Sequence, residues 1–193
     1  DWDSLTFSLT PTDTMYITTT TGDEPWMPGD LQPYGDVPMS PAAGVLNYGQ
    51  GLFEGMKAYK DDKGDVYMFR PEENFNRINK SGERLAMPAF EKDYFFDGLN
   101  TLLNLDKDWI KPGEGNSLYI RPFVIATENG VSASPSSEYK FVIICAPAQA
   151  YYSGEVRVLF ADHYSRSADG GVGFAKAAGN YAAQFYPTEL AKA

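Results

Sequence analysis

The chain has 193 residues, 43% of them hydrophobic and 22% charged, which is typical of a globular protein with one good core or two small ones. The 26 acidic residues outnumber the 16 basic ones, and the net charge of −10 argues against a nucleic-acid binder, which needs clustered Lys and Arg. One cysteine, Cys145, and one histidine, His163, exclude an internal disulfide and sites that need two histidines. Because neither a membrane-span pattern nor a signal-peptide pattern is present, we expect the reducing cytosol or an organelle matrix.

The first half of the chain predicts two strands that form a hairpin, followed by a helix. The first 45 residues are rich in turns, with one strand expected at 15–19. Two runs, at 53–59 and 65–69, flank a turn signal and predict the β-hairpin. Pro71 suits the first position of a helix, and apolar residues at helical spacing predict that helix over 71–86.

The second half predicts a second helix and then three strands. The helix is expected over 92–105, where leucines and aromatic residues form one stripe. Strands are expected at 117–127, 139–146 and 156–162, and the apolar run of the middle strand is typical of a strand buried on both faces. A last helix is expected after Tyr181, kinked or broken at Pro187 because an interior proline costs about 3 kcal/mol.

These elements predict an α+β fold in two unequal parts. Residues 1–149 are expected to form a small domain, an antiparallel sheet with flanking helices. Residues 150–154 would connect it to the beginning of a larger domain at 155–193. A chain that stops inside a helix, without a cap, is expected to be the front part of a longer protein. The acidic residues are spread along the sequence and are expected on a solubilising surface.

Lys176 is the most informative single residue. It lies in a small, glycine-rich string at 173–179, and no other charge occurs between Asp169 and Glu189. Loss of hydration favours the neutral amine, which can attack a carbonyl and form a Schiff base. A surface lysine beside a flexible loop is the alternative, and composition alone favours it.

The string SLYIRP at 117–122 predicts a carboxylate receptor, because alternation along a strand places Tyr119 and Arg121 on one face. The alternative for Arg121 is a surface ion pair. Pro122 removes one ladder donor, which predicts an edge strand or a bulge. In the hairpin, Gly55 would leave room for a ligand or another backbone.

Arg77 lies off the apolar stripe of the first predicted helix. A guanidinium there could bind a phosphate with two parallel hydrogen bonds. A solvated helix face is the commoner alternative.

Four strings occur in an order and spacing that resemble the branched-chain amino acid aminotransferases, fold-type IV enzymes that depend on pyridoxal 5′-phosphate. They are LNYGQGLFEGMKAY (46–59), FRPEENFNR (69–77), SLYIRP (117–122) and KAAGNY (176–181). The resemblance runs from about residue 7 to the end of the chain, and four ordered strings make it specific.

The resemblance implies a role for each matching residue. Lys176 matches the lysine that binds the cofactor aldehyde and then moves the substrate proton. Tyr181 matches the tyrosine at the phenolic oxygen of the cofactor, and Arg77 matches the phosphate-binding arginine. The residues that match the substrate pocket are Phe7, Phe53, Gly55, Tyr119 and Tyr151, and those that match the dimer interface and the neighbour's pocket are Tyr48 and Val131. Arg121 and Tyr48 would receive the distal carboxylate of glutamate or 2-oxoglutarate.

The resemblance further implies a homodimer that transfers the amino group of Leu, Ile or Val to 2-oxoglutarate, with no metal. A D-amino acid aminotransferase or an aminodeoxychorismate lyase of the same fold is the first alternative. A non-catalytic acid-binding module is the second. The string KAAG stands where the family more often has Lys-x-Gly-Gly, which changes no proposed chemical group.

Overall fold

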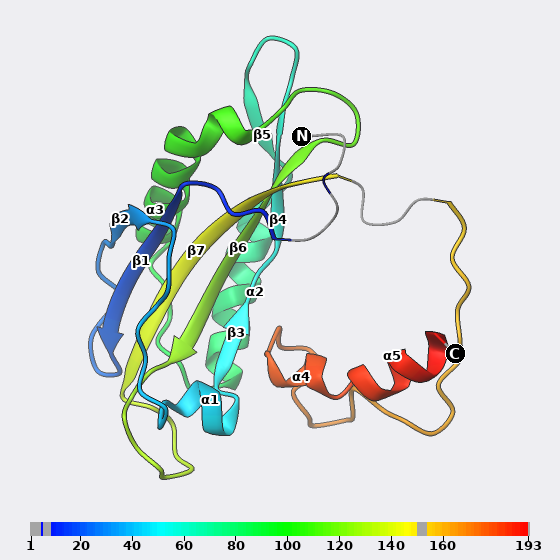
Figure 1. Cartoon of the computed structure of the whole chain (residues 1–193). Coiled ribbons are helices and arrows are strands. Elements are labelled where there is room, and N and C mark those ends of the chain that lie inside the picture. Colours follow the sequence, from blue (N-terminus) through cyan, green and yellow to red (C-terminus); the bar gives the residue numbers. More distant parts are fainter. Residues whose placement is uncertain (1–4, 6–8, 150–153, 193) are drawn as a thin grey trace.

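The computed structural model describes residues 5, 9–149 and 154–192 (Figure 1). Its centre is a seven-stranded sheet in the order β2-β1-β7-β6-β4-β5, with β3 also paired to β6, and every pairing is antiparallel. The strands are β1 (Thr14–Thr21), β2 (Asp30–Pro33), β3 (Gly51–Phe53), β4 (Met56–Lys60), β5 (Val66–Met68), β6 (Ser117–Ala126) and β7 (Glu138–Ala148).

Two long helices, α2 (Pro71–Arg84) and α3 (Lys92–Asp106), lie against the same face of this sheet (Figure 1). Their apolar stripes pack into the core, where Ile78 of α2 and Leu99 of α3 are at most 1% exposed. The shorter helices are α1 (Gly44–Tyr48), the 3₁₀ turn η2 (Lys107–Trp109), α4 (Gly179–Ala182) and α5 (Phe185–Lys192). This arrangement confirms the predicted α+β fold with an antiparallel sheet and flanking helices.

Alternation along β6 separates a core face from an open face. Leu118, Ile120 and Val124 point into the core, where each is at most 1% exposed. Tyr119 and Arg121 alternate with them and are only partly buried. The side of the sheet that the long helices leave uncovered therefore carries the predicted carboxylate receptor.

The interpretation of Pro122 as a sign of an edge strand is wrong, because β6 pairs with β7 on one side and with β3 and β4 on the other. Phe53 lies opposite Phe123 and Met56 opposite Ile120, so β3 and β4 keep one register across the residues between them. The Glu54 N–H donates to the Pro122 carbonyl oxygen at 2.7 Å, whereas the proline nitrogen can donate nothing in return. The missing donor is thus accommodated by a break in the neighbouring strand.

Most predicted elements are confirmed within a few residues. Both long helices, the hairpin and the strands at 15–19, 117–127 and 139–146 are present. The short elements β2 and α1 were not expected from the turn-rich start of the chain. The strand expected at 156–162 is absent, since this apolar segment has no strand partner among the described residues and its Val158 and Phe160 are 78% and 87% exposed.

The helical segment after Tyr181 is broken, as expected, but the break lies between α4 and α5, before the proline. Pro187 lies in the first turn of α5, where backbone N–H groups lack an intrahelical acceptor in any case. In the part of the chain that is described, no helix is long and apolar enough to cross a membrane. The division into domains at 1–149, 150–154 and 155–193 stays a prediction.

Candidate active site

The backbone of Lys176 is held from two sides. Its N–H donates to the Ser81 hydroxyl of α2 at 2.9 Å, and its carbonyl oxygen accepts from the Phe53 N–H at 3.1 Å. One step further on, the Ala178 N–H donates to the Gly51 carbonyl at 2.9 Å. The glycine-rich segment is therefore fixed between β3 and the C-terminal part of α2.

The Lys176 side chain lies in an aromatic setting. Its Nζ donates to the Tyr181 hydroxyl at 2.7 Å and lies 4.4 Å from the centroid of the Phe53 ring. The Phe53 and Tyr181 rings pack with their centroids 4.8 Å apart. Asn180 ties the loop together, because its Nδ2 donates to the carbonyl oxygens of Val172 and Ala175. The amine thus has one defined position rather than that of a loose surface lysine.

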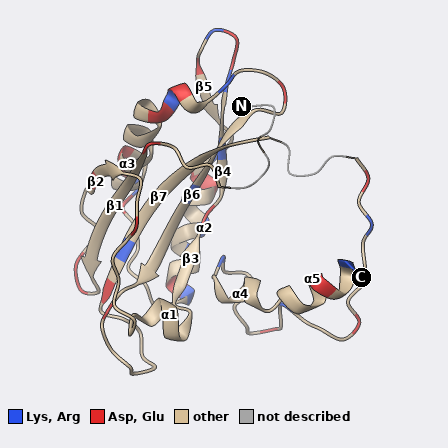
Figure 2. Ribbon diagram, viewed as in Figure 1, with Lys and Arg blue, Asp and Glu red and all other residues tan. Residues whose placement is uncertain are grey.

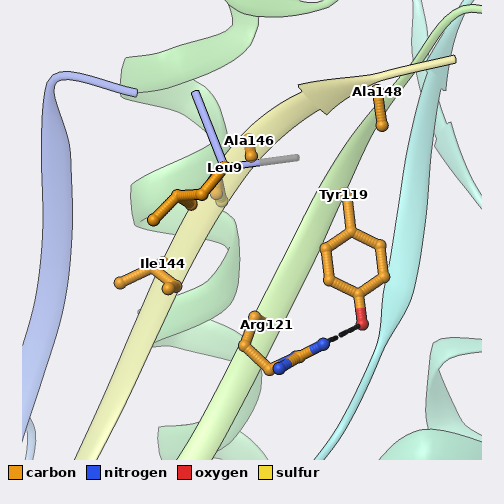
Figure 3. A pocket seen from close by; sticks show the side chains of 7 residues that line it. Leu9, Tyr119, Arg121, Ile144, Ala146 and Ala148 are labelled. Atoms are coloured by element: carbon orange, nitrogen blue, oxygen red, sulfur yellow. Dashed lines mark hydrogen bonds between the residues drawn. The ribbon is translucent and has the colours of Figure 1, made fainter. Parts of the chain in front are cut away.

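Tyr119 and Arg121 lie together on the open face of β6, as alternation predicted. The Arg121 Nη2 donates to the Tyr119 hydroxyl at 2.8 Å (Figure 3). The Arg121 guanidinium lies 4.4 Å from the centroid of the Phe53 ring. Arg121 makes no ion pair with any acidic side chain of the described residues, which disfavours the surface-pair alternative.

These two residues line a pocket of about 240 Å³ whose other walls are apolar (Figure 3). Burial in the sheet raises the pKa of the Cys145 thiol, so this cysteine is an inert packing residue. The remaining lining residues are Leu9, Ile144, Ala146 and Ala148. One guanidinium at the edge of an apolar pocket can receive either a carboxylate or an aliphatic side chain.

Gly55 does not leave space for a ligand or another backbone, contrary to the expectation. A Cβ at this position would collide with the hydroxyl group of Tyr119, whose Cζ would lie only 3.1 Å away. The lack of a side chain at Gly55 therefore makes room for the Tyr119 hydroxyl, which occupies the space that a side chain at position 55 would take.

Arg77 forms a two-point ion pair with Glu54, a residue that the sequence did not single out. Its Nε lies 2.6 Å from Glu54 Oε1 and its Nη2 lies 2.8 Å from Oε2. The Glu54 side chain is 0% exposed, whereas that of Arg77 is 48% exposed and also lines a surface hollow of about 540 Å³. Hydrogen bonds to Glu54 raise the pKa of Arg77 further above its ordinary value.

Among the described residues, Glu54 is one of two exceptions to the expected acidic surface. Figure 2 shows the acidic residues spread along loops and helices. Glu54 and Asp106 are nevertheless fully buried, with 0% and 2% exposure. The available signal for Glu54 was its position inside a strand-forming apolar string, where a carboxylate needs a partner.

Helix α2 carries both Arg77 and Ser81, the residue that binds the backbone of Lys176. Arg77 and Ser81 are four residues apart and therefore lie on one face of the helix. Ser81 holds the backbone of Lys176, and Tyr181 is close enough to Arg77 to act on it electrostatically. Predicted residues that form one connected group are Gly55, Phe53, Arg77, Tyr119, Arg121, Lys176 and Tyr181.

Two of the predicted residues that the structure describes lie outside this group. Tyr48 and Val131 meet on the surface, where the Tyr48 hydroxyl donates to the Val131 carbonyl oxygen, and they are 47% and 83% exposed. Among the described residues, no hydrogen bond or ring contact joins either of them to Lys176. Phe7 and Tyr151 lie outside the described residues.

The donor set fits a phosphorylated aldehyde cofactor. A fixed amine, a hydroxyl group 2.7 Å from it and an arginine with unused N–H groups suit an aldehyde, a phenolate and a phosphate, respectively.

Comparison with solved structures identifies proteins of the same fold. Two solved structures share the fold: the branched-chain aminotransferase from Thermoproteus uzoniensis with norvaline, and the T.th. branched-chain amino acid aminotransferase complexed with N-(5′-phosphopyridoxyl)-L-glutamate. The match to the first has a TM-score of 0.70 at 21% identity and covers 92% of this chain and 56% of that chain. The match to the second has a TM-score of 0.66 at 22% identity and covers 90% of this chain and 52% of that chain. The fold is thus that of a fold-type IV aminotransferase.

Sequence comparison narrows this class. A probable branched-chain-amino-acid aminotransferase from Staphylococcus aureus (strain N315) is 50% identical over 165 residues, which are 83% of this chain and 46% of that protein. No family model matches. The chain belongs to the branched-chain amino acid aminotransferase family, and it spans about half the length of the curated relatives it matches.

Proposed function

We propose that the protein containing this chain is a pyridoxal-phosphate-dependent aminotransferase that moves the amino group of Leu, Ile or Val to 2-oxoglutarate. The observation that carries this proposal is the position of Lys176, whose amine lies 2.7 Å from the Tyr181 hydroxyl and whose backbone is bound to β3 and α2. The names of the relatives support the branched-chain substrates over the D-amino acid and lyase alternatives.

Each proposed cofactor ligand has a distinct task. Lys176 would bind the cofactor aldehyde, Tyr181 its phenolic oxygen and Arg77 its phosphate. Pyridoxal phosphate, when bound, withdraws electrons from the α-carbon of the substrate and carries the amino group between substrates. Lys176 Nζ, once free, is the general base that takes the proton from the α-carbon, and the Tyr181 hydroxyl keeps this amine in place.

The open face of β6 would bind the substrate side chain. An aliphatic side chain would contact the apolar walls of the pocket in Figure 3, and a distal carboxylate would bind to Arg121. Phe53 contacts both Arg121 and Lys176 and would form the wall between side-chain site and reacting amine. The structure of the T.th. relative with a phosphopyridoxyl-glutamate compound supports both the cofactor and the dicarboxylate substrate.

We further propose a homodimer whose interface includes Tyr48 and Val131. Both are exposed apolar or aromatic residues joined by one hydrogen bond, and no hydrogen bond or ring contact of the described residues joins them to Lys176. In a dimer they would approach the pocket of the neighbour, where Tyr48 would join Arg121 in binding the carboxylate. The proposed compartment is the cytosol or an organelle matrix, which suits the single buried cysteine.

The test is an assay of the full-length protein with 2-oxoglutarate and either L-leucine or D-leucine. We expect formation of glutamate with L-leucine only. Turnover of D-leucine alone would favour a D-amino acid aminotransferase. Turnover of neither amino acid, in protein that contains the cofactor, would contradict the proposed function.

A further inference from the structure

We propose that Glu54 is a positioning residue, which turns Arg77 toward the phosphate of the cofactor and acts only through that arginine. This inference rests on the proposed function, because it assumes that Arg77 binds the phosphate. It goes further by giving a purpose to the buried acid at the break between β3 and β4.

The Glu54 side chain is completely buried. A carboxylate without exposed surface is strongly destabilising unless it is paired and hydrogen-bonded. Glu54 accepts from Arg77 Nε and Nη2, from Asn74 Nδ2 at 2.8 Å and from the Gly55 N–H at 3.2 Å. The acid is therefore satisfied, and its position is fixed by groups from both α2 and its own strand.

The Glu54 side chain has a fixed direction. Its N–H donates to the Pro122 carbonyl on the neighbouring strand, which anchors its backbone. Alternation then points the Phe53 and Gly55 positions to the open face and the Glu54 side chain to the α2 face. A single strand break thus places the substrate wall and the partner of Arg77 side by side.

Glu54 occupies only part of the N–H groups of Arg77. A guanidinium carries five N–H donors in one rigid plane, and Glu54 uses two of them, on one edge. The other three donate to no described residue, and the side chain remains about half exposed. Because the group is planar, fixing one edge on Glu54 sets the direction of the opposite edge, which would face the phosphate.

Position 54 requires a carboxylate rather than an amide, because both of its oxygens accept hydrogen bonds. Glutamine at position 54 would keep an oxygen for Arg77 Nε but would direct an NH₂ group at Arg77 Nη2 or at Asn74 Nδ2. Two donors would then face each other, so the arginine would have to turn away. Glu73 of α2 offers a matched control, because it pairs with Arg70, the residue just before this helix, and 61% of its side chain is exposed.

The experiment compares the affinities of the full-length protein, freed of cofactor, for pyridoxal phosphate and for pyridoxal, which lacks the phosphate. In Glu54→Gln we expect the affinity for pyridoxal phosphate to fall about ten- to a hundred-fold, in line with the loss of a charge-assisted contact. The affinity for pyridoxal should change less than about threefold. Glu73→Gln should change neither affinity.

A double variant tests whether Glu54 acts through Arg77. Arg77→Gln should lower the preference for the phosphorylated cofactor, and Glu54→Gln added to it should lower that preference no further. If Glu54→Gln fails to fold, Asn74→Ala replaces it; this variant removes one hydrogen bond to Glu54, and the same selective loss should appear at smaller size.

The outcomes separate the two proposals. A wild-type protein that binds pyridoxal phosphate no better than pyridoxal contradicts the proposed function itself. A wild-type preference that survives both Glu54→Gln and Asn74→Ala, or equal losses for both ligands with a lower melting temperature, overturns the positioning role alone.

Discussion

At the scale of single residues, Phe53 organises the candidate site. The Lys176 amine and the Arg121 guanidinium both lie 4.4 Å from the centroid of its ring. A cation near an aromatic ring is attracted to the ring's electron-rich face. Phe53 thus holds both groups close together. No acidic side chain of the described residues forms an ion pair with either, which leaves both available to substrate groups.

Arg121→Ala is expected to impair the dicarboxylate substrates selectively. The kcat/KM for glutamate and 2-oxoglutarate should fall about ten- to a hundred-fold, because charge-assisted hydrogen bonds contribute about 1.5–3 kcal/mol. The kcat/KM for leucine should change little, since an aliphatic side chain contacts the apolar walls. Equal losses for leucine and glutamate, together with a lower melting temperature, would show instead that Arg121 is structural.

The sequence could predict the residues of the site whose surroundings are local. Alternation alone places Tyr119 beside Arg121, and the uncharged string around Lys176 is visible without a structure. Glu54 could not be assigned in this way, because its burial depends on Arg77 and Asn74, which lie 20 or more residues away. For the same reason, the space beside Gly55 could not be assigned to the Tyr119 hydroxyl.

At the scale of elements, the end of α2 carries a backbone conformation that suits glycine. Ala86 has a φ of +55°, and the N–H of Met87 donates to the Gly82 carbonyl across this turn. Such a left-handed residue after a helix is usually glycine, because a Cβ is strained there. The turn matters to the site, since α2 carries both Arg77 and Ser81.

Ala86→Gly is therefore expected to stabilise the protein by about 0.5–1 kcal/mol, the relief of strain being partly offset by the greater freedom of glycine in the unfolded chain. The melting temperature of the full-length protein should rise by roughly 1 °C, because the shift per kcal/mol falls as chain length increases. Ala86→Val is the contrasting variant at the same exposed position and should lower the melting temperature. A loss of stability in Ala86→Gly would count against the left-handed turn.

The two long helices could be predicted from signals that lie close together in the sequence. Apolar residues recur at helical spacing in both, Pro71 marks the start of α2, and a proline-glycine pair at 112–113 follows α3. Elements that depend on distant partners could not be predicted. The apolar segment at 156–162 reads as a strand but has no described neighbour to pair with, and the short strand β2 exists only through its pairing with β1. Likewise, Pro122 is tolerated in a central strand because the break at Glu54 lies directly beside it.

At the scale of the whole molecule, the sheet separates the core from the site. One face is closed by α2 and α3, and the other carries the pocket of Figure 3. Asp106, at the end of α3, is buried on the closed side. Burial raises the pKa of this carboxyl, hydrogen bonds from Thr12 and Thr14 oppose the shift, and the charge of Asp13 adds to it. Its Oδ2 has no partner among the described residues.

This buried acid predicts a pH-dependent effect on stability. Because the folded-state pKa lies above the unfolded value, the folded protein binds the proton more tightly, and the Asp106 contribution to stability is lost as pH rises through the folded pKa. Asp106→Asn removes this dependence. The stability of Asp106→Asn relative to wild type should therefore increase from about pH 4 upward and then level off.

Urea unfolding of both proteins across this pH range measures the difference. Asp97→Asn, an exposed carboxyl of the same helix, controls for the loss of one negative charge. A difference between Asp106→Asn and wild type that stays constant with pH would show that Asp106 is ionised in the folded protein as readily as in the unfolded chain.

The most direct measurement is borohydride reduction of the full-length protein with bound pyridoxal phosphate, followed by peptide mapping by mass spectrometry. Reduction fixes the cofactor to the amine that carries it. We expect the added mass on the peptide that contains Lys176, none on the neighbouring Lys80 and none at all in Lys176→Ala. Cofactor fixed to another lysine, or an unmodified Lys176 in protein that turns over leucine, would contradict the assignment of this site.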